Sequence, residues 1–227
     1  MAEEQTSRKR VAVLISGRGS NMAALAAAAD DPAYPAAIAL VVSNRPNAAG
    51  LAIARARGIE TAVVDHTTHG KDRAAFERVL QEVLERHRID LVCLGGFMRL
   101  FTPQFVALWE GRMLNIHPAL LPSFKGLDTH AHALEAGVRI HGATVHFVVP
   151  EMDAGPIVIQ AAVPVLDDDT PDSLAARVVG VEHRIYPLAL RWLAEGRLRR
   201  VGGRCRVDGV PGAGAVLIHP QASPSSR

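Results

Sequence analysis

One short stretch decides the fold: Val11-Ala12-Val13-Leu14-Ile15, followed directly by Ser16-Gly17-Arg18-Gly19-Ser20-Asn21. The first five residues are all apolar and too few for a helix, as expected of a strand that is buried on both faces. The glycine-rich residues that follow lead into an alanine-rich stretch, Met22 to Ala29, which is expected to be helical. A strand that enters a helix through a glycine loop is typical of α/β proteins with parallel sheets.

Strand-like and helical stretches go on alternating through the first hundred residues. Apolar runs at 38–42, 61–64 and 91–94 predict strands, and the stretches 48–57 and 72–88 between them predict helices. We therefore expect an α/β fold with a doubly wound, mostly parallel twisted sheet of the Rossmann-like kind and right-handed crossovers.

The second half of the chain is less regular. Thr102-Pro103 and Thr170-Pro171 each predict a helix start, with threonine as N-cap and proline at the first helical position. Pro187 is expected to kink or divide the second of these helices, and Asp208-Gly209 is a hairpin turn signal. The remaining expected elements are strands at 113–116, 143–149 and 157–165, the last two antiparallel to some neighbours, and a helix at 129–136. The C-terminal part of the sheet is thus expected to be mixed.

Length and composition suit one globular domain. The chain has 227 residues, 48% of them hydrophobic, which is enough to bury a sizeable core. We expect a flexible N-terminus (1–10), one domain (11–200) with halves 11–100 and 101–200, and a C-terminal extension (201–227) whose Ser/Pro-rich end is disordered. A monomer and a homodimer are both compatible with the sequence.

Charge and hydropathy limit the partners. The net charge of +2 does not call for a polyanion, and the arginines between 197 and 206 have no aromatic residues among them to stack bases. Residues 1–10 are polar, and the apolar run behind them is far too short to span a bilayer. We expect a cytoplasmic protein that acts on small molecules and binds neither nucleic acid nor membrane.

The loop of residues 16–21 predicts an anion site. Backbone N–H groups at a helix N-terminus, with little side-chain bulk around them, attract phosphate. A dinucleotide-binding loop would need glycine where Met22 stands, and the Gly-Lys-Ser/Thr of a Walker A loop is absent. The phosphate would then belong to a smaller substrate, unless the glycines only allow a tight turn in which Ser20 caps the helix.

Two further stretches carry side chains suited to chemistry at a carbonyl group. Asn115 and His117 lie two residues apart, so an extended backbone puts them on one face. An amide donor beside an imidazole can stabilise an oxyanion and move a proton, and Asp153, in a turn between two expected strands, would favour the protonated ring. Each also has an ordinary explanation: a backbone contact for Asn115, a loop histidine for His117, a turn for Asp153.

A metal centre and a serine nucleophile are not indicated. The pairs His66 and His69, and His130 and His132, lack a nearby cysteine or carboxylate at zinc spacing. The sequence also has no Gly-x-Ser-x-Gly nucleophile motif. We expect a site that works without metal.

Together these motifs resemble the formyltransferase family that uses 10-formyltetrahydrofolate, and within it the members that act on glycinamide ribonucleotide. The resemblance covers about residues 11–198. The motifs that carry it are Ser16-Gly17-Arg18-Gly19-Ser20-Asn21, Gly96-Phe97-Met98-Arg99, Asn115-Ile116-His117-Pro118-Ala119-Leu120-Leu121-Pro122, His141-Gly142-Ala143-Thr144-Val145-His146-Phe147, Asp153-Ala154-Gly155-Pro156 and Glu182-His183-Arg184-Ile185-Tyr186-Pro187.

The resemblance implies roles for particular residues. Residues 11–100 would bind the phosphate, and residues 101–200 would carry the folate and catalytic site. The implied catalytic residues are Asn115, His117 and Asp153. The implied substrate contacts are Gly19, Ser20 and Asn21 for the ribose phosphate and Glu182 for the ribose hydroxyls. The implied folate contacts are Arg73, Met98, Arg99, Leu100, Phe101, Asn115, Val149, Pro150, Glu151, Met152 and Asp153.

The implied reaction is transfer of the formyl group from 10-formyltetrahydrofolate, as co-substrate, to the amine of 5′-phosphoribosylglycinamide in purine biosynthesis. The alternatives are a formyltetrahydrofolate hydrolase, a methionyl-tRNA formyltransferase and a binding module without catalysis. The hydrolase is expected to carry an extra N-terminal domain and the tRNA enzyme a larger basic C-terminal domain. Neither of these two enzymes explains the phosphate loop.

Overall fold

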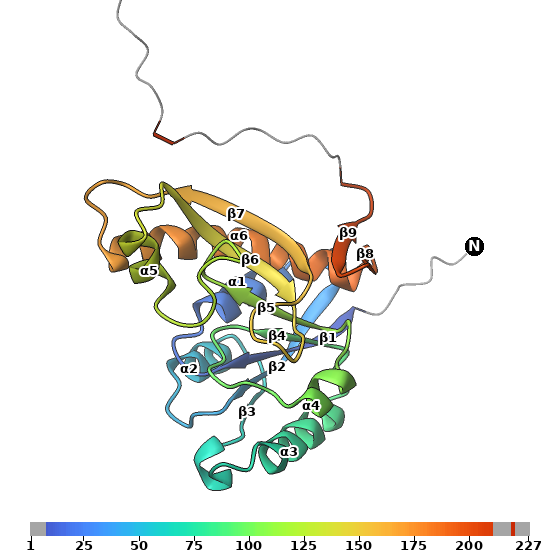
Figure 1. Ribbon diagram of the computed structural model, residues 1–227. Coiled ribbons are helices and arrows are strands. Elements are labelled where there is room, and N and C mark those ends of the chain that lie inside the picture. The colour runs from blue at the N-terminus through green and yellow to red at the C-terminus, as the bar shows by residue number, and fades with distance from the viewer. Residues whose placement is uncertain (1–7, 211–218, 221–227) are drawn as a thin grey trace, which may run out of the picture.

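The computed structural model describes residues 8–210 and 219–220, and its centre is a seven-stranded sheet of order β3-β2-β1-β4-β5-β6-β7 (Figure 1). The strands are β1 Lys9–Ile15, β2 Ala36–Ser43, β3 Thr61–Val63, β4 Leu91–Leu94, β5 Met113–His117, β6 Ile140–Phe147 and β7 Ile157–Pro164. Neighbours from β3 to β5 are parallel, whereas β6 is antiparallel to both β5 and β7. The expected mostly parallel sheet with a mixed C-terminal part is confirmed.

Helices cover both faces of this sheet (Figure 1). On one face lie α1 Ser20–Ala29, α2 Ala49–Ala56, α5 Thr129–Glu135 and α6 Pro171–Ala194, and on the other lie α3 Arg73–Arg86 and α4 Pro103–Leu108, with the 3₁₀ helix η1 His66–His69 before α3. Side chains of β1 alternate between the two cores: Val11 and Val13 pack under α1 and α6, and Ala12 and Leu14 under α3 and α4. Because both faces are covered there, residues 11–15 of β1 are all apolar, whereas Lys9 and Arg10 at its start are exposed.

The structure differs from two expectations for the second half. Helix α6 is not divided at Pro187 but runs through 24 residues. The Pro187 carbonyl accepts a hydrogen bond of 2.6 Å from the Tyr34 hydroxyl, and the neighbouring Tyr186 is fully buried. We attribute the continuity of α6 to this packing, which offsets the cost of about 3 kcal/mol that proline carries inside a helix.

The C-terminal hairpin turns earlier than its sequence signal suggests. Strands β8 Leu198–Val201 and β9 Arg204–Val207 are joined by Gly202 and Gly203, both with positive φ (56° and 76°). Two glycines supply the left-handed conformations of a two-residue hairpin turn as readily as Asp-Gly does. Asp208-Gly209 instead follows β9, where the Asp208 N–H donates to the Arg197 carbonyl.

The two ends of the chain can be compared with the domain boundaries expected from the sequence. Strand β1 begins at Lys9, inside the N-terminal segment expected to be flexible. Residues 1–7 and 221–227, for which flexibility and disorder were expected, lie outside the described residues. Among the residues that are described, no helix combines the length and the apolar character needed to cross a membrane.

Candidate active site

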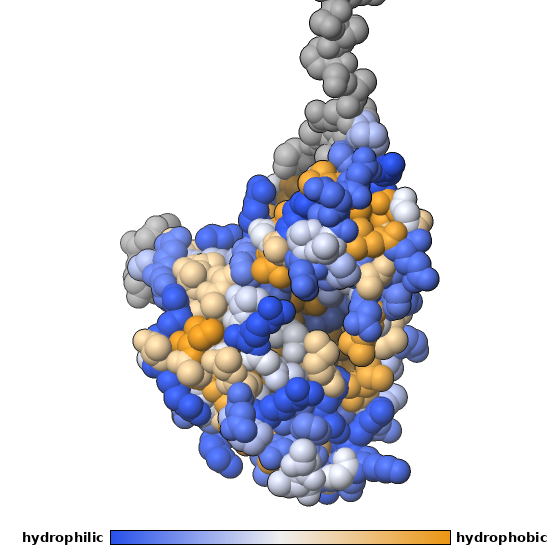
Figure 2. All heavy atoms as spheres, turned by 90° about the vertical axis from the view of Figure 1, so that its left-hand side faces the viewer, coloured by the Kyte–Doolittle hydropathy of each residue, from blue (hydrophilic) through white to orange (hydrophobic). Residues whose placement is uncertain are grey.

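One large cleft lies at the carboxyl edge of the parallel strands, with a volume of about 920 Å³. Open α/β sheets bind ligands at this edge, where the loops after the strands converge. Apolar patches lie among hydrophilic ones on the side of the molecule that carries α2 and α5 (Figure 2). The expected site residues that line the cleft are Gly19, Ser20, Asn21, Met98, Arg99, Leu100, Phe101, Asn115, His117, Val149, Pro150, Glu151, Met152, Asp153 and Glu182.

The cleft and the sequence expectation differ in a few residues. Arg73 begins α3, is exposed, and does not line the cleft. Sequence reasoning assigned no role to Arg18, Arg45, His130 or His146, all of which line it. Arg18 and Arg45 lie in the loops after β1 and β2. Because both follow strands that the sequence predicts, their place at the ligand-binding edge could have been predicted as well. His146 reaches the site only through the pairing of β5 with β6, which places it opposite Asn115.

The glycine loop leaves the first turn of α1 open. The N-cap is Gly19, in the left-handed region at φ 75°, and no side chain caps the helix, so the alternative in which Ser20 is the cap is wrong. The first intrahelical hydrogen bond joins the Ala23 N–H to the Gly19 carbonyl over 2.9 Å, which leaves the preceding N–H groups without intrahelical partners. Only glycine fits at position 19, because a Cβ there would lie 2.8 Å from the Gly50 Cα. The loop is therefore a tight turn, and the N–H groups at its helix end are of the kind that can bind an anion.

A carboxylate stands beside this loop. Asn21 Nδ2 donates to Glu182 Oε2 over 2.7 Å, which links α1 to α6 across 161 residues of sequence. Glu182 is only 4% exposed. Burial raises the pKa of Glu182, and the hydrogen bond from Asn21 opposes that shift in part. The loop end of the cleft thus offers N–H donors and one hydrogen-bond acceptor side by side.

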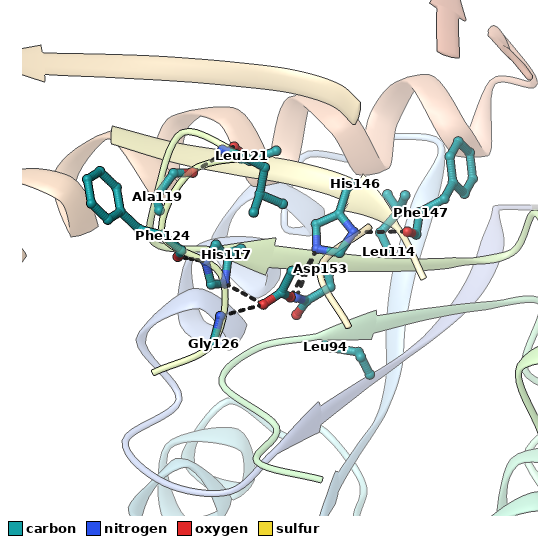
Figure 3. Close-up of polar contacts among 12 residues, drawn as sticks. Leu94, Leu114, His117, Ala119, Leu121, Phe124, Gly126, His146, Phe147 and Asp153 are labelled. Carbon is teal, nitrogen blue, oxygen red and sulfur yellow. Dashed lines mark hydrogen bonds and ion pairs between the residues drawn. The ribbon is translucent and has the colours of Figure 1, made fainter. Parts of the chain in front are cut away.

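His117 lies between two acceptor oxygens at the end of β5 (Figure 3). Its Nε2 is 2.8 Å from the Phe124 carbonyl oxygen, and its Nδ1 is 3.4 Å from Asp153 Oδ2. Each ring nitrogen therefore lies next to an oxygen that can accept a hydrogen bond. Asp153 Oδ2 also accepts from the Gly126 N–H over 3.0 Å. The two side chains are 5% and 11% exposed, so their charges are only weakly screened by water.

His146 fixes the amide of Asn115. Asn115 Nδ2 is 3.2 Å from His146 Nε2, and His146 Nδ1 is 2.9 Å from the Phe147 carbonyl oxygen, which can only accept. Burial lowers the pKa of His146, so the neutral ring carries its proton on Nδ1 and accepts from Asn115 at Nε2. One Asn115 N–H is thereby engaged, and the other is left for the cleft.

A pair of histidines lies behind His117. The rings of His130 and His141 meet edge to face at 5.3 Å, and His141 is 1% exposed. Burial, and then the neighbouring His130, lower the pKa of His141 to about 4. In the described part of the chain no three or more His, Cys, Asp or Glu side chains are arranged to hold a metal ion.

His141 should make the fold sensitive to acid. The pKa of His141 is about 4 in the folded protein and 6.5 in the unfolded chain. Above pH 6.5 the ring is neutral in both states and the fold has its full stability. As the pH falls toward 4, the unfolded chain binds a proton that the folded protein does not, so stability is lost. We expect the free energy of unfolding to drop by up to about 3 kcal/mol over that range from this group. Urea denaturation between pH 7 and pH 4 measures it. In His141→Leu the free energy of unfolding should depend less on pH. In His132→Leu, which changes an exposed position of α5, the pH dependence should stay as in the native protein. The same pH dependence in the native protein and both variants would refute the assignment.

Comparison with known proteins identifies the family to which this architecture belongs. The family model described as formyl transferase matches residues 9–190. The chain belongs to the formyl transferase family. A phosphoribosylglycinamide formyltransferase of Escherichia coli (strain K12) is 43% identical over 199 residues, covering 88% of this chain and 93% of that protein. The crystal structure of glycinamide ribonucleotide transformylase 1 from Symbiobacterium toebii superimposes with a TM-score of 0.87 at 43% identity, covering 91% of this chain and 97% of that one.

Other similar proteins differ in length or in the activity that their names give. A trifunctional purine biosynthetic protein adenosine-3 of Bos taurus is 50% identical over 195 residues, which are 86% of this chain. This chain spans about a fifth (19%) of that relative's length. A formyltetrahydrofolate deformylase from Pseudomonas syringae pv. tomato has a TM-score of 0.82 at 27% identity, covering 88% of this chain and 66% of that one. The family fold is therefore shared by transferases and by a deformylase.

Proposed function

We propose that this chain transfers the formyl group of 10-formyltetrahydrofolate to the amine of 5′-phosphoribosylglycinamide, giving formylglycinamide ribonucleotide and tetrahydrofolate. One observation carries the proposal: an open glycine loop lies in the same cleft as a group of three polar side chains, the buried His117 and the partly buried Asn115 and Asp153. The loop suits the phosphate of one substrate, and the three side chains suit a carbonyl carbon. Relatives of nearly the same length, named as phosphoribosylglycinamide formyltransferase, support the choice.

The chemistry assigned to the three side chains is acyl transfer without a metal. The substrate amine attacks the formyl carbon, forming a C–N bond and a tetrahedral oxyanion. The bond from that carbon to N10 of the folate then breaks, and the proton lost by the amine ends on N10. The free N–H of Asn115 and the protonated His117 stabilise the oxyanion. Asp153 holds the charge on His117 and helps pass the proton to N10.

The loop end of the cleft takes the acceptor substrate. Gly19, Ser20 and Asn21 supply backbone N–H groups to the phosphate, and Glu182 accepts from the ribose hydroxyls. Arg18 and Arg45 line the same region of the cleft, and their positive charge favours a phosphate there. The phosphate then lies on the loop, and the amine points toward His117.

The opposite wall of the cleft takes the folate. Met98, Leu100 and Met152 line the cleft and are 59%, 52% and 49% exposed. Exposed apolar side chains in a cleft suit the flat pterin ring and its linker. Cytoplasmic location, small molecules as the only partners, and a monomeric or homodimeric state belong to the same proposal.

The experiment that tests the proposal separates transfer from hydrolysis. The purified chain is mixed with 10-formyltetrahydrofolate, with and without glycinamide ribonucleotide, and both tetrahydrofolate and formylated nucleotide are measured. We expect the two products in equal amounts and none without the acceptor. Tetrahydrofolate and formate formed at the same rate without the acceptor would identify a hydrolase. Binding of both ligands with no product would identify a binding module.

A further inference from the structure

We propose that Ser16 is a positioning residue that couples the acceptor site to the folate site, so that each substrate binds more tightly when the other is present. The inference rests on the proposed function, because that function assigns one ligand to each end of the cleft. It concerns a residue that belongs to neither set of expected ligand contacts.

The Ser16 hydroxyl joins the ends of three strands. Ser16 follows β1, and its Oγ donates to Oδ1 of Asn44, the residue after β2, over 2.6 Å. The same oxygen accepts from the N–H of Met98, in the segment after β4, over 2.8 Å. Ser16 and Asn44 are 4% and 1% exposed. A hydroxyl has one proton to donate and lone pairs to accept with, so this geometry uses it in both directions.

Ser16 is connected to both binding surfaces, to one by the chain and to the other by a hydrogen bond. On one side the chain continues from Ser16 into the glycine loop, where the Gly17 carbonyl accepts from the Gly50 N–H over 3.0 Å. On the other side Met98 begins the exposed apolar wall assigned to the folate. The Ser16 N–H also donates to the Gly96 carbonyl over 3.2 Å. Loop and wall are therefore tied together at Ser16.

Binding at either end should order the shared residue. A phosphate on the glycine loop restrains residues 17–21, and with them Ser16. A folate on the wall restrains the Met98 backbone and hence the same hydroxyl. The second ligand then meets a surface that is already ordered, which raises its affinity. Such coupling is reciprocal, and a factor of about five is at the lower end of what is commonly seen.

The experiment measures binding with a pair of ligands that cannot react. Glycinamide ribonucleotide and tetrahydrofolate form a ternary complex without a formyl group, so calorimetry gives the Kd of each ligand alone and with the other at saturation. We expect each Kd to fall about fivefold in the native protein. In Ser16→Ala that factor should approach one, and Ser16→Thr, which keeps the hydroxyl, should restore it. If Ser16→Ala does not fold, Ser16→Cys, with a weaker hydrogen-bonding group, takes its place with the same expected result.

Ser43→Ala is the matched control. Ser43 ends β2, next to Asn44, and is 0% exposed. Its hydroxyl closes its own turn, donating to the Arg45 carbonyl over 2.9 Å and accepting from the Arg45 N–H over 3.0 Å. Ser43→Ala should therefore lose stability but keep the fivefold coupling. Coupling that persists in Ser16→Ala, that is lost equally in Ser43→Ala, or that is absent from the native protein would overturn the inference. A failure of the proposed function would show separately, as no formyl transfer by the native chain.

Discussion

Asp153→Asn is expected to lower the turnover of formyl transfer by about a hundredfold or more while the fold stays intact. The carboxylate faces His117 Nδ1 at 3.4 Å in a setting where water screens charges only weakly. An asparagine side chain has nearly the same shape and can still accept from the Gly126 N–H, but it carries no charge. His117→Ala removes the ring itself and should lower turnover by a similar factor.

Turnover at saturating substrates, measured as tetrahydrofolate formed, reports the chemical role. Thermal unfolding and circular dichroism of the same samples report the fold. Asp168→Asn is the control, because Asp168 is exposed before α6 and does not line the cleft. It should retain full activity. Near-native turnover in either Asp153→Asn or His117→Ala would remove these residues from the mechanism.

Local rules account for most of the fold that could be predicted from the sequence. Residues 11–15 of β1 form an unbroken apolar run because both faces of the strand are covered there. The Thr102 and Thr170 side chains cap α4 and α6 as expected, each accepting from a backbone N–H. Gly58, at φ 72°, ends α2 in the left-handed conformation. Each of these features depends on a few neighbouring residues, which is why the sequence reveals them.

The features that escaped prediction depend on contacts between distant residues. The continuity of α6 through Pro187 accompanies packing against Tyr34, 153 residues away. The position of His146 follows from the antiparallel register of β5 and β6, which a short strand pattern does not specify. The contact between Asn21 and Glu182 joins the first and last helices of the domain. Such residues could be named from the family motifs, but their geometry needed the structure.

Gly155→Ala is expected to destabilise the fold by about 3 kcal/mol and to lower turnover at the same time. A Cβ built at Gly155 would lie 1.7 Å from the Phe147 carbonyl oxygen. That atom is backbone, held in place where the Phe147 N–H donates to the Pro156 carbonyl over 3.0 Å, so a side-chain rotation cannot relieve the overlap. The turn between β6 and β7 must move instead, and Asp153 is part of that turn. A displacement of about 1 Å at a catalytic group can cost a hundredfold in rate.

Gly180→Ala separates this steric effect from the general effect of adding a methyl group. Gly180 lies inside α6, and nothing stands within 4 Å of a Cβ built there. The change should stabilise the protein by up to about 1 kcal/mol, because alanine is the better helix former, and should leave turnover unchanged. Chemical denaturation gives both free energies, and the folate assay gives both rates at a temperature where each variant is folded. If Gly155→Ala keeps native stability and turnover, the turn can shift without carrying Asp153 with it. Loss of stability together with loss of turnover, against the opposite result for Gly180, would show that the packing of Gly155 on Phe147 holds the carboxylate opposite His117.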